Sequence, residues 1–313
     1  MARAFIFPGQ GAQTIGMGRA LAEAYPAAQA VFDEVDAALG ENLSGLIWEG
    51  DIETLTLTQN AQPALMATSM AAMRALESEG VTIAAASFVA GHSLGEYSAL
   101  TAAGALALAD SARLLRLRGQ AMQAAVPVGV GAMAALLGLD LATAREVAAE
   151  AAQGEICEAA NDNDPAQVVI SGHKAAVERA LDIAKARGAK RALLLPVSAP
   201  FHCALMAPAA EAMAAALAEV TISTPEVPLV ANVLAAPVST PEQIRELLVQ
   251  QVTGSVRWRE SVEVMAAEGV AEFWEIGAGK ALSGMVKRIR RDSVQRSIGT
   301  PDEVRAAAAA LAG

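Results

Sequence analysis

The stretch Gly-His-Ser-Leu-Gly-Glu at residues 91–96 decides the predicted fold. The apolar segment 87–90 precedes it and a helix-like segment follows, so this Gly-x-Ser-x-Gly pattern lies where a strand meets a helix. The pattern is typical of a nucleophile elbow, in which Ser93 takes a strained backbone conformation at a sharp turn. Glycine at 91 and 95 removes side chains that would clash, and the helix end presents unpaired N–H groups to a developing anion. The same short pattern also occurs in ordinary turns, so evidence from the rest of the chain is needed to distinguish a nucleophile elbow from such a turn.

Length and composition place the chain among sizeable globular proteins. Its 313 residues suggest about two domains, and 54% hydrophobic residues supply a large core although only 4% are aromatic. A net charge of -11 argues against nucleic acid as a partner, and no apolar run reaches the roughly 18–20 residues that span a bilayer. Cys157 and Cys203 give neither a disulfide framework nor a metal-binding spacing, so both are expected as buried thiols. With no signal sequence at its start, the chain is expected in the cytoplasm, away from membranes and as a monomer by default.

Alternating strand-like and helix-like segments predict an α/β fold with a mostly parallel sheet covered on both faces. Because the elbow is typical of α/β-hydrolases, we expect an α/β-hydrolase-like large domain made of residues 1–128 and 198–313. Residues 129–197 interrupt it in the order β-α-β-β-α-β, the split unit of a ferredoxin-like domain. The elements expected in this inserted small domain are strands 131–139, 155–160, 167–171 and 191–196 and helices 142–152 and 175–187.

The loop at residues 8–13 follows the first strand and contains Gly-x-Gly. It lacks the third glycine and the lysine of nucleotide-binding loops, so nucleotide binding is not expected there. Loops at the carboxyl ends of strands are nevertheless where open α/β sheets place ligand groups.

Two local features of the large domain follow from helix-end signals. Asp110 is expected as the N-cap of a helix over 111–125, and Arg116 on that helix as a solvated charge. The segment 282–291 is expected as the last helix that faces the sheet.

A nucleophilic serine needs a general base within hydrogen-bond reach, and that base is usually histidine. His173 follows a strand of the small domain and fits a capping or surface role. The side chain of His92 is expected to point away from Ser93 and to support the turn. His202 lies where the chain re-enters the large domain, on a segment that Pro200 stiffens. His202 is therefore preferred as the base, with His92 as the alternative.

A third group usually orients the imidazole, and in hydrolases with this elbow it is an acid between the serine and the histidine. All such acids except Asp110 fall at or within the inserted domain, and Asp110 is expected to cap a helix. A backbone carbonyl can replace the acid, because it accepts a hydrogen bond from a ring N–H. The missing acid argues against a plain serine esterase.

Four motifs agree in order and spacing: residues 7–13 (FPGQGAQ), 91–96 (GHSLGE), 116–119 (RLRG) and 200–202 (PFH). Together they resemble the malonyl-CoA:acyl carrier protein transacylases, over essentially the whole chain and including the inserted small domain. The resemblance implies transfer of malonyl from malonyl-CoA to the phosphopantetheine thiol of acyl carrier protein, for fatty acid synthesis. It also implies a covalent malonyl-serine intermediate and no metal or redox cofactor.

The resemblance implies a role for each matching residue. Ser93 would be acylated, His202 would be its base, and the main-chain carbonyl of Gln251 would hold the histidine. Arg118 would bind the malonyl carboxylate. The oxyanion hole would consist of the backbone N–H groups of Gln10 and Leu94.

The resemblance also implies two pocket residues. Asn161 matches an active-site asparagine of the family, although an Asx turn remains an alternative role for it. Phe201 stands beside the proposed base, where its bulk and that of Leu94 favour malonyl over methylmalonyl. Asp162 stands where many members of the family carry Tyr or another residue, and Phe201 stands where some carry Ser, and these two departures leave the exact shape of the pocket open.

An acidic carrier protein can dock on this acidic chain only through a local basic patch. The densest basic cluster holds Lys287, Arg288, Arg290 and Arg291, and a second one holds Lys185, Arg187, Lys190 and Arg191. A solvated helix end explains such clusters equally well. Three other functions stay open: a serine hydrolase or thioesterase, the malonyl-transferring subunit of a malonate decarboxylase, and a non-catalytic carrier-binding module.

Overall fold

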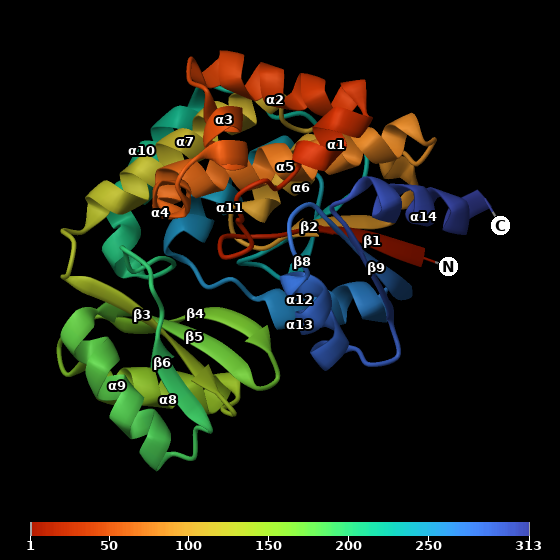
Figure 1. Cartoon of the computed structure of the whole chain (residues 1–313). Coiled ribbons are helices and arrows are strands. Elements are labelled where there is room, and N and C mark those ends of the chain that lie inside the picture. The colour runs from red at the N-terminus through yellow and green to blue at the C-terminus, as the bar shows by residue number, and fades with distance from the viewer. Residues whose placement is uncertain (1, 313) are drawn as a thin grey trace.

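The computed structural model describes residues 2–312, which form a mixed α/β fold around two sheets (Figure 1). The larger sheet has six strands in the order β10-β9-β1-β2-β7-β8, and four of its five pairings are parallel. This confirms the predicted mostly parallel sheet. Its strands are β1 (Ala2–Phe7), β2 (Phe88–Gly91), β7 (Leu229–Ala231), β8 (Ala236–Val238), β9 (Val270–Ile276) and β10 (Val294–Ile298).

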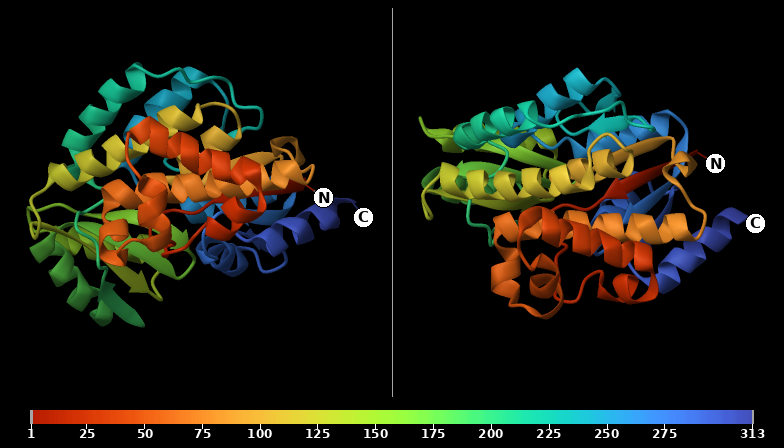
Figure 2. Two further views of the ribbon diagram at one scale, coloured as in Figure 1. Left: turned by 45° about the horizontal axis from the view of Figure 1, so that its top comes forward. Right: turned by 90° about the horizontal axis from the view of Figure 1, so that it is seen from above.

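Helices cover both faces of this sheet, as the two turned views show (Figure 2). One face carries most of them: α1 (Arg19–Ala24), α2 (Pro26–Leu39), α3 (Leu43–Glu49), α4 (Ile52–Thr56), α5 (Thr58–Ser78), α6 (Gly95–Ala102), α7 (Leu108–Ala125), α10 (Ala207–Ala218), α11 (Pro241–Thr253) and α14 (Pro301–Ala312). The other face is covered by α12 (Trp258–Ala267) and α13 (Ala281–Ile289). Short 3₁₀ turns occupy Ile83–Ala85 and Ala204–Met206.

The first strand shows how the sequence builds these two layers. Phe5 and Phe7 belong to the hydrophobic core under the larger set of helices, whereas Ala4 and Ile6 belong to the core under α12 and α13. Successive side chains of a strand point to opposite faces, so a strand that is apolar throughout must be buried on both sides. This is why the short segment Ala4–Phe7 reads as a continuous apolar run.

The smaller sheet is antiparallel in the order β4-β5-β3-β6. It consists of β3 (Gly131–Leu137), β4 (Cys157–Asp164), β5 (Gln167–His173) and β6 (Arg191–Leu194). Helices α8 (Leu141–Ala152) and α9 (Lys174–Ala186) pack on one face around their own apolar cluster. On the other face, Met133 and Val169 join the core of the larger sheet. The smaller sheet is thus fixed to the larger unit by apolar packing.

Some elements predicted from the sequence differ from those in the structure, and each difference has an identifiable reason. Strand β4 extends to Asp164 because its polar residues, which read as a turn, pair with β5. Helix α13 is not the last sheet-facing element, since β10 and α14 follow it. Strand β10 is a partly exposed edge strand with polar residues, and it lacks the apolar run that revealed the inner strands. The helix with Asp110 begins at Leu108 with Ala107 at its N-cap, so the predicted cap was wrong.

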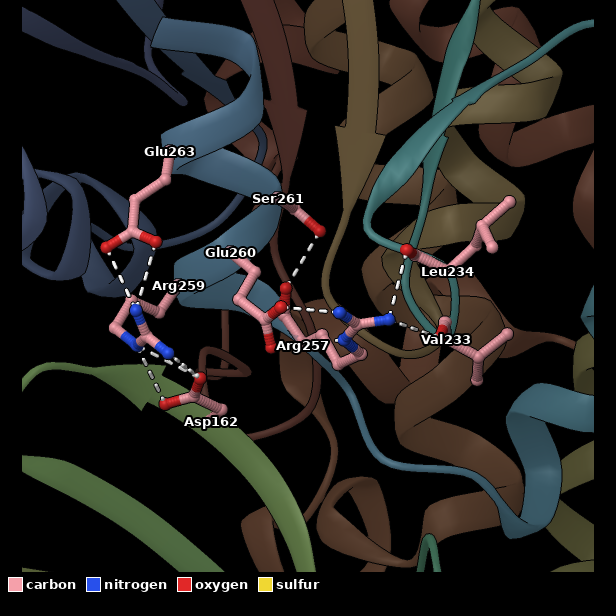
Figure 3. Close-up of polar contacts among 8 residues, drawn as sticks. All are labelled: Asp162, Val233, Leu234, Arg257, Arg259, Glu260, Ser261 and Glu263. Carbon is pink, nitrogen blue, oxygen red and sulfur yellow. Dashed lines mark hydrogen bonds and ion pairs between the residues drawn. The ribbon is translucent and has the colours of Figure 1, made fainter. Parts of the chain in front are cut away.

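Strand β4 also joins the two sheets along its free edge. Its Asp162 N–H donates to the carbonyl of Val256 at 2.9 Å, and the N–H of Val256 donates to the carbonyl of Ala160 at 2.8 Å. The buried carboxylate of Asp162 pairs with Arg259 of α12 at 3.0 Å (Figure 3). Asp164, likewise buried, pairs with Arg288 of α13 at 2.6 Å. An edge strand with exposed N–H and C=O groups is a ready partner for another segment, and here that segment is the stretch around Val256 that precedes α12.

Replacing Arg259 by Met should lower the free energy of unfolding by about 3 kcal/mol, because it leaves the Asp162 carboxylate buried without its cation. Urea denaturation measures the change. Glu263 is the exposed second partner of Arg259, and Glu263→Gln is the matched control with an expected cost below about 1 kcal/mol. Equal effects of the two substitutions would contradict a structural role for the buried pair.

Candidate active site

The predicted elbow is present, and its backbone is crowded on both sides. Ser93 lies between β2 and α6 with φ of 54°, in the left-handed region that non-glycine residues rarely adopt. A Cβ atom on Gly91 would lie 1.9 Å from the carbonyl carbon of Gly95. A Cβ atom on Gly95 would lie 2.3 Å from the carbonyl oxygen of Phe7. Glycine is therefore required at both positions by close backbone approach.

The structure brings Ser93 and His202 together. The Oγ atom of Ser93 and the Nε2 atom of His202 are 2.7 Å apart. The Nδ1 atom of His202 is 2.8 Å from the carbonyl oxygen of Gln251 and 3.2 Å from that of Gly254. Because carbonyl oxygens only accept, Nδ1 must carry the proton and Nε2 is left to accept the hydrogen bond from Ser93. This is the tautomer that a general base requires.

His202 is also held neutral. Burial and the nearby Arg118 cation lower its pKa to about 3, since both disfavour the imidazolium. A neutral imidazole bonded to a serine hydroxyl can take the proton from that hydroxyl as it attacks an electrophile. The geometry therefore suits nucleophilic catalysis over the whole neutral pH range.

Arg118 lies beside the serine hydroxyl and is 1% exposed. Its Nη2 atom donates to Ser93 Oγ at 3.2 Å and to Gln251 Oε1 at 2.7 Å, and its Nη1 atom donates to Gln62 Oε1 at 2.7 Å. Its Nε atom is buried and has no hydrogen-bond partner among residues 2–312. A buried guanidinium with neutral partners and an unused donor is a binding group for an anion.

A cavity of about 410 Å³ opens onto these groups. Its lining includes seven residues predicted from the sequence, namely Gln10, Ser93, Leu94, Arg118, Asn161, Phe201 and His202. Asn161 lies in β4 and pairs with Val256 of the larger unit, so it occupies a strand rather than an Asx turn. The remaining lining combines apolar side chains, such as Met122, Met133, Leu195 and Val197, with the polar side chains of Gln13, Thr56, Thr58, Gln62 and His92.

Sequence reasoning missed several polar residues behind the cavity. Glu96 is buried and accepts from the side-chain amide of Gln251, as well as from the backbone N–H of Asn232 at 3.2 Å. Asn232 also accepts from the N–H of Ser93 at 2.8 Å and donates to the carbonyl of Gly91 at 2.7 Å. Glu96 belongs to the elbow motif itself, and Asn232 directly follows β7. The carboxyl end of a parallel strand was the one signal that pointed to Asn232.

The other predicted residues have structural contacts. The Nε2 atom of His92 lies 2.8 Å from Asn163 Oδ1, and Nδ1 of His173 accepts from the N–H of Ile156 at 2.9 Å. Arg116 is buried rather than solvated, because it donates to the carbonyl of Gln59 at 2.7 Å and to Asn60 and pairs with Glu41. The predicted free cysteines, Cys157 and Cys203, are both buried.

Among residues 2–312, no three His, Cys, Asp or Glu side chains are grouped so that they would hold a metal ion. No helix within the same residues has the length and apolarity that crossing a bilayer requires.

Gly91→Ala should lower the free energy of unfolding by at least about 2 kcal/mol and displace the serine hydroxyl, because the new Cβ meets rigid backbone. Gly284→Ala is the matched control. That glycine lies inside α13 with its nearest neighbour 3.6 Å from the added Cβ, so alanine there should stabilise by about 0.5–1 kcal/mol. Urea denaturation of both variants measures the difference, and a harmless Gly91→Ala would refute the crowded bend.

The chain matches the model of the acyl transferase domain family over residues 4–304. It is 48% identical over 304 residues to the malonyl CoA-acyl carrier protein transacylase of Escherichia coli (strain K12), covering 97% of this chain and 98% of the relative. An acyl-carrier-protein-S-malonyltransferase from Bartonella henselae is 56% identical and superimposes with a TM-score of 0.98 over the full length of both chains.

A third structure contains a type II PKS acyl-carrier protein in complex with its malonyl-transacylase. The matching chain of that structure is 43% identical, with a TM-score of 0.96 over 99% of this chain and 100% of the other. These likenesses run the full length of the chain and confirm the resemblance found in its four motifs. The chain is therefore an acyltransferase and belongs to the family of malonyl-CoA:acyl carrier protein transacylases.

Proposed function

We propose that this enzyme transfers the malonyl group of malonyl-CoA to the phosphopantetheine thiol of acyl carrier protein, and so supplies malonyl groups for fatty acid synthesis. The observation that carries the proposal is a buried guanidinium, Arg118, 3.2 Å from a serine hydroxyl that lies 2.7 Å from its base. A serine with a base suits acyl transfer in general, and the adjacent cation selects acyl groups that bear a carboxylate. The names of the relatives support the same substrate pair.

In the first half-reaction, Ser93 Oγ attacks the thioester carbonyl carbon while its proton passes to Nε2 of His202. The carbonyl of Gln251 stabilises the imidazolium through Nδ1–H. The backbone N–H groups of Gln10 and Leu94 hold the oxyanion, and one such donor contributes about 3–4 kcal/mol to lowering the barrier. When the tetrahedral intermediate collapses, the carbon–sulfur bond breaks and the CoA sulfur takes the proton from His202.

In the second half-reaction, the phosphopantetheine thiol gives its proton to His202 and attacks the malonyl-serine ester. Collapse of the second intermediate returns the proton to Ser93 and releases the malonyl thioester. The two substrates thus use the same groups in turn, which is a ping-pong mechanism. Each half-reaction balances without a metal ion or a redox cofactor, so we propose that none takes part.

Arg118 selects the substrate by pairing with the malonyl carboxylate in the cavity that this guanidinium lines. A hydrogen bond to a charged group contributes about 1.5–3 kcal/mol, which favours malonyl over acetyl at least tenfold. Phe201 and Leu94 narrow the cavity, and Asn161 lines it. We propose on this basis that methylmalonyl is a poorer substrate than malonyl.

We propose a division into an α/β-hydrolase-like large domain, residues 1–128 and 198–313, and a ferredoxin-like small domain, residues 129–197. The strand order β4-β5-β3-β6 with two helices on one face supports the small domain. The elbow after a parallel strand supports the large one. We also propose that the protein is cytoplasmic and monomeric. Two buried free thiols are compatible with the reducing environment of the cytoplasm.

The alternatives predict other acceptors. A hydrolase or thioesterase would pass the acyl group to water, and a malonate decarboxylase subunit would pass it to a different carrier. The His202 ring is oriented by two backbone carbonyls where a hydrolase of this type uses an acid, which favours the transferase. A non-catalytic module would not need the serine and its base at hydrogen-bond distance.

Brief incubation with malonyl-CoA should add the mass of one malonyl group to the protein, as measured by intact-mass spectrometry. Ser93→Ala should add none. Arg118→Ala should slow malonyl transfer at least about tenfold and slow acetyl transfer much less, because only malonyl has a carboxylate to pair. Stable adducts that form only with carrier protein present, or rapid loss of malonyl to water, would contradict the proposed transferase.

We propose that carrier protein docks on the basic cluster of Lys287, Arg288, Arg290 and Arg291, at the end of α13. Of these four, Arg288 is paired with Asp164, whereas the other three are exposed and make no ion pair within residues 2–312. In the second cluster, Lys185 pairs with Asp182 and Arg187 pairs with Glu146 and Glu150, so part of its charge is already compensated. The first cluster therefore offers more free positive charge to an acidic partner.

Lys287→Glu should raise the KM for carrier protein several-fold at low salt and leave the KM for malonyl-CoA unchanged, because the charge acts on docking alone. Lys185→Glu is the matched charge reversal on the small domain and should leave both constants near the wild-type values. Steady-state kinetics with both variants test this, and a larger effect of Lys185→Glu would move the dock to the second cluster.

A further inference from the structure

The side-chain amide of Gln251 connects the buried cation to a buried carboxyl group. Arg118 can only donate hydrogen bonds, so the Gln251 atom that faces it at 2.7 Å must be the oxygen. The amide nitrogen is thereby turned the other way, where it donates to the carbonyl of Ser93 at 2.9 Å and to Glu96. One side chain thus touches the cation, the nucleophile's backbone and the carboxyl group.

Glu96 is 1% exposed and lies in the first turn of α6. The groups that face it come from four elements: Tyr97 on its own helix, Arg118 on α7, Asn232 after β7 and Gln251 on α11. Arg118 is the one charged group among them. Burial raises the pKa of Glu96 to about 7, against the opposing effects of the hydrogen bonds from Gln251 and Asn232 and of the Arg118 cation. The free enzyme therefore holds both protonation states near neutral pH.

The balance of charge changes when an acid substrate binds. Above neutral pH the free pocket contains one cation, Arg118, and one carboxylate, Glu96. A malonyl carboxylate on Arg118 would add a second anion to the same buried site. In a medium of low dielectric constant, two like charges around one cation are costly, and the site can avoid this by neutralising one carboxyl.

We propose that, above neutral pH, Glu96 takes up one proton from solvent when the malonyl carboxylate pairs with Arg118, so that the buried pocket holds one positive and one negative charge both before and after the substrate binds. Glu96 is in this sense a positioning and charge-compensating residue that acts through Gln251 and Arg118, without touching the substrate. This inference rests on the proposed malonyl transfer. In the step itself a carboxylate and a solvent proton give a carboxylic acid, and no other bond changes.

The sign of the pH dependence follows from this balance. Free enzyme loses the Glu96 proton above pH 7, whereas malonyl-enzyme keeps it. Forming malonyl-enzyme therefore consumes a proton at any pH between the pKa of Glu96 in the free enzyme and its higher pKa in the malonyl-enzyme. The equilibrium constant for acylation by malonyl-CoA should therefore fall about tenfold between pH 6 and pH 8. Acetyl-CoA brings no carboxylate, and its equilibrium constant should stay nearly level over the same range.

The test measures protons taken up per CoA released when enzyme is mixed with malonyl-CoA at pH 8 in weak buffer with an indicator dye. We expect nearly one proton per CoA for the wild type and none per CoA for Glu96→Gln, whose proton count per CoA also gives the correction for ionisation of the CoA thiol. Glu275→Gln is the matched control, because Glu275 is another buried carboxyl that accepts from the backbone N–H groups of Leu282 and Ser283, away from the cavity. It should behave like the wild type.

A second measurement keeps the test decisive if Glu96→Gln folds poorly. Intact-mass spectrometry of the wild type at equilibrium with malonyl-CoA and CoA gives the acylation constant from pH 6 to pH 8, with acetyl-CoA for comparison. A level constant for malonyl, or equal proton uptake in wild type and Glu96→Gln, would overturn the role of Glu96 while acylation of Ser93 persists. Absence of any acyl-enzyme would instead overturn the proposed function.

Discussion

The backbone of the elbow folds so tightly on itself at Gly91, and passes so close to the end of β1 at Gly95, that only glycine fits at these two positions. This approach forces Ser93 into the left-handed region, and Asn232 stabilises it there by accepting from its N–H. Strand β1, strand β2 and strand β7 all end at this point, because parallel strands bring their carboxyl ends to one edge of the sheet. The loop that carries Gln10, the serine and Asn232 are neighbours for that single topological reason.

Gln251 is the residue through which the groups of the site influence one another. Its carbonyl orients His202, and its amide oxygen accepts from Arg118. Burial, and after it the Arg118 cation, lowers the pKa of His202 and keeps its imidazole neutral, so this guanidinium also helps to preserve the base in its reactive form. The proposed substrate selection by Arg118 would therefore be coupled electrostatically to activation of the nucleophile, and Glu96 belongs to the same buried network.

Strand β4 connects the smaller sheet to the larger unit through the side chains of its last four residues. Its residues alternate between two faces, so Asn161 reaches the cavity while Asp162 pairs with Arg259 on α12. Asn163 holds His92 at the elbow, and Asp164 pairs with Arg288. These contacts of four consecutive residues fix the position of the smaller sheet relative to Ser93. They thereby set the shape of the cavity between the two units.

The sequence by itself determined the elbow, the α/β class, the family and the residues that meet at the cavity, because short-range patterns and motif spacing report local backbone requirements directly. It also indicated, through the missing acid, that a carbonyl orients His202. Only the tertiary structure decided that Arg116 is buried, that the polar end of β4 is a strand, and that Glu96 and Asn232 belong to the site. The contacts of Arg116, Glu96 and Asn232, and the ion pairs of the β4 carboxylates Asp162 and Asp164, all involve partners more than forty residues away, and no local pattern encodes where burial will place such a partner.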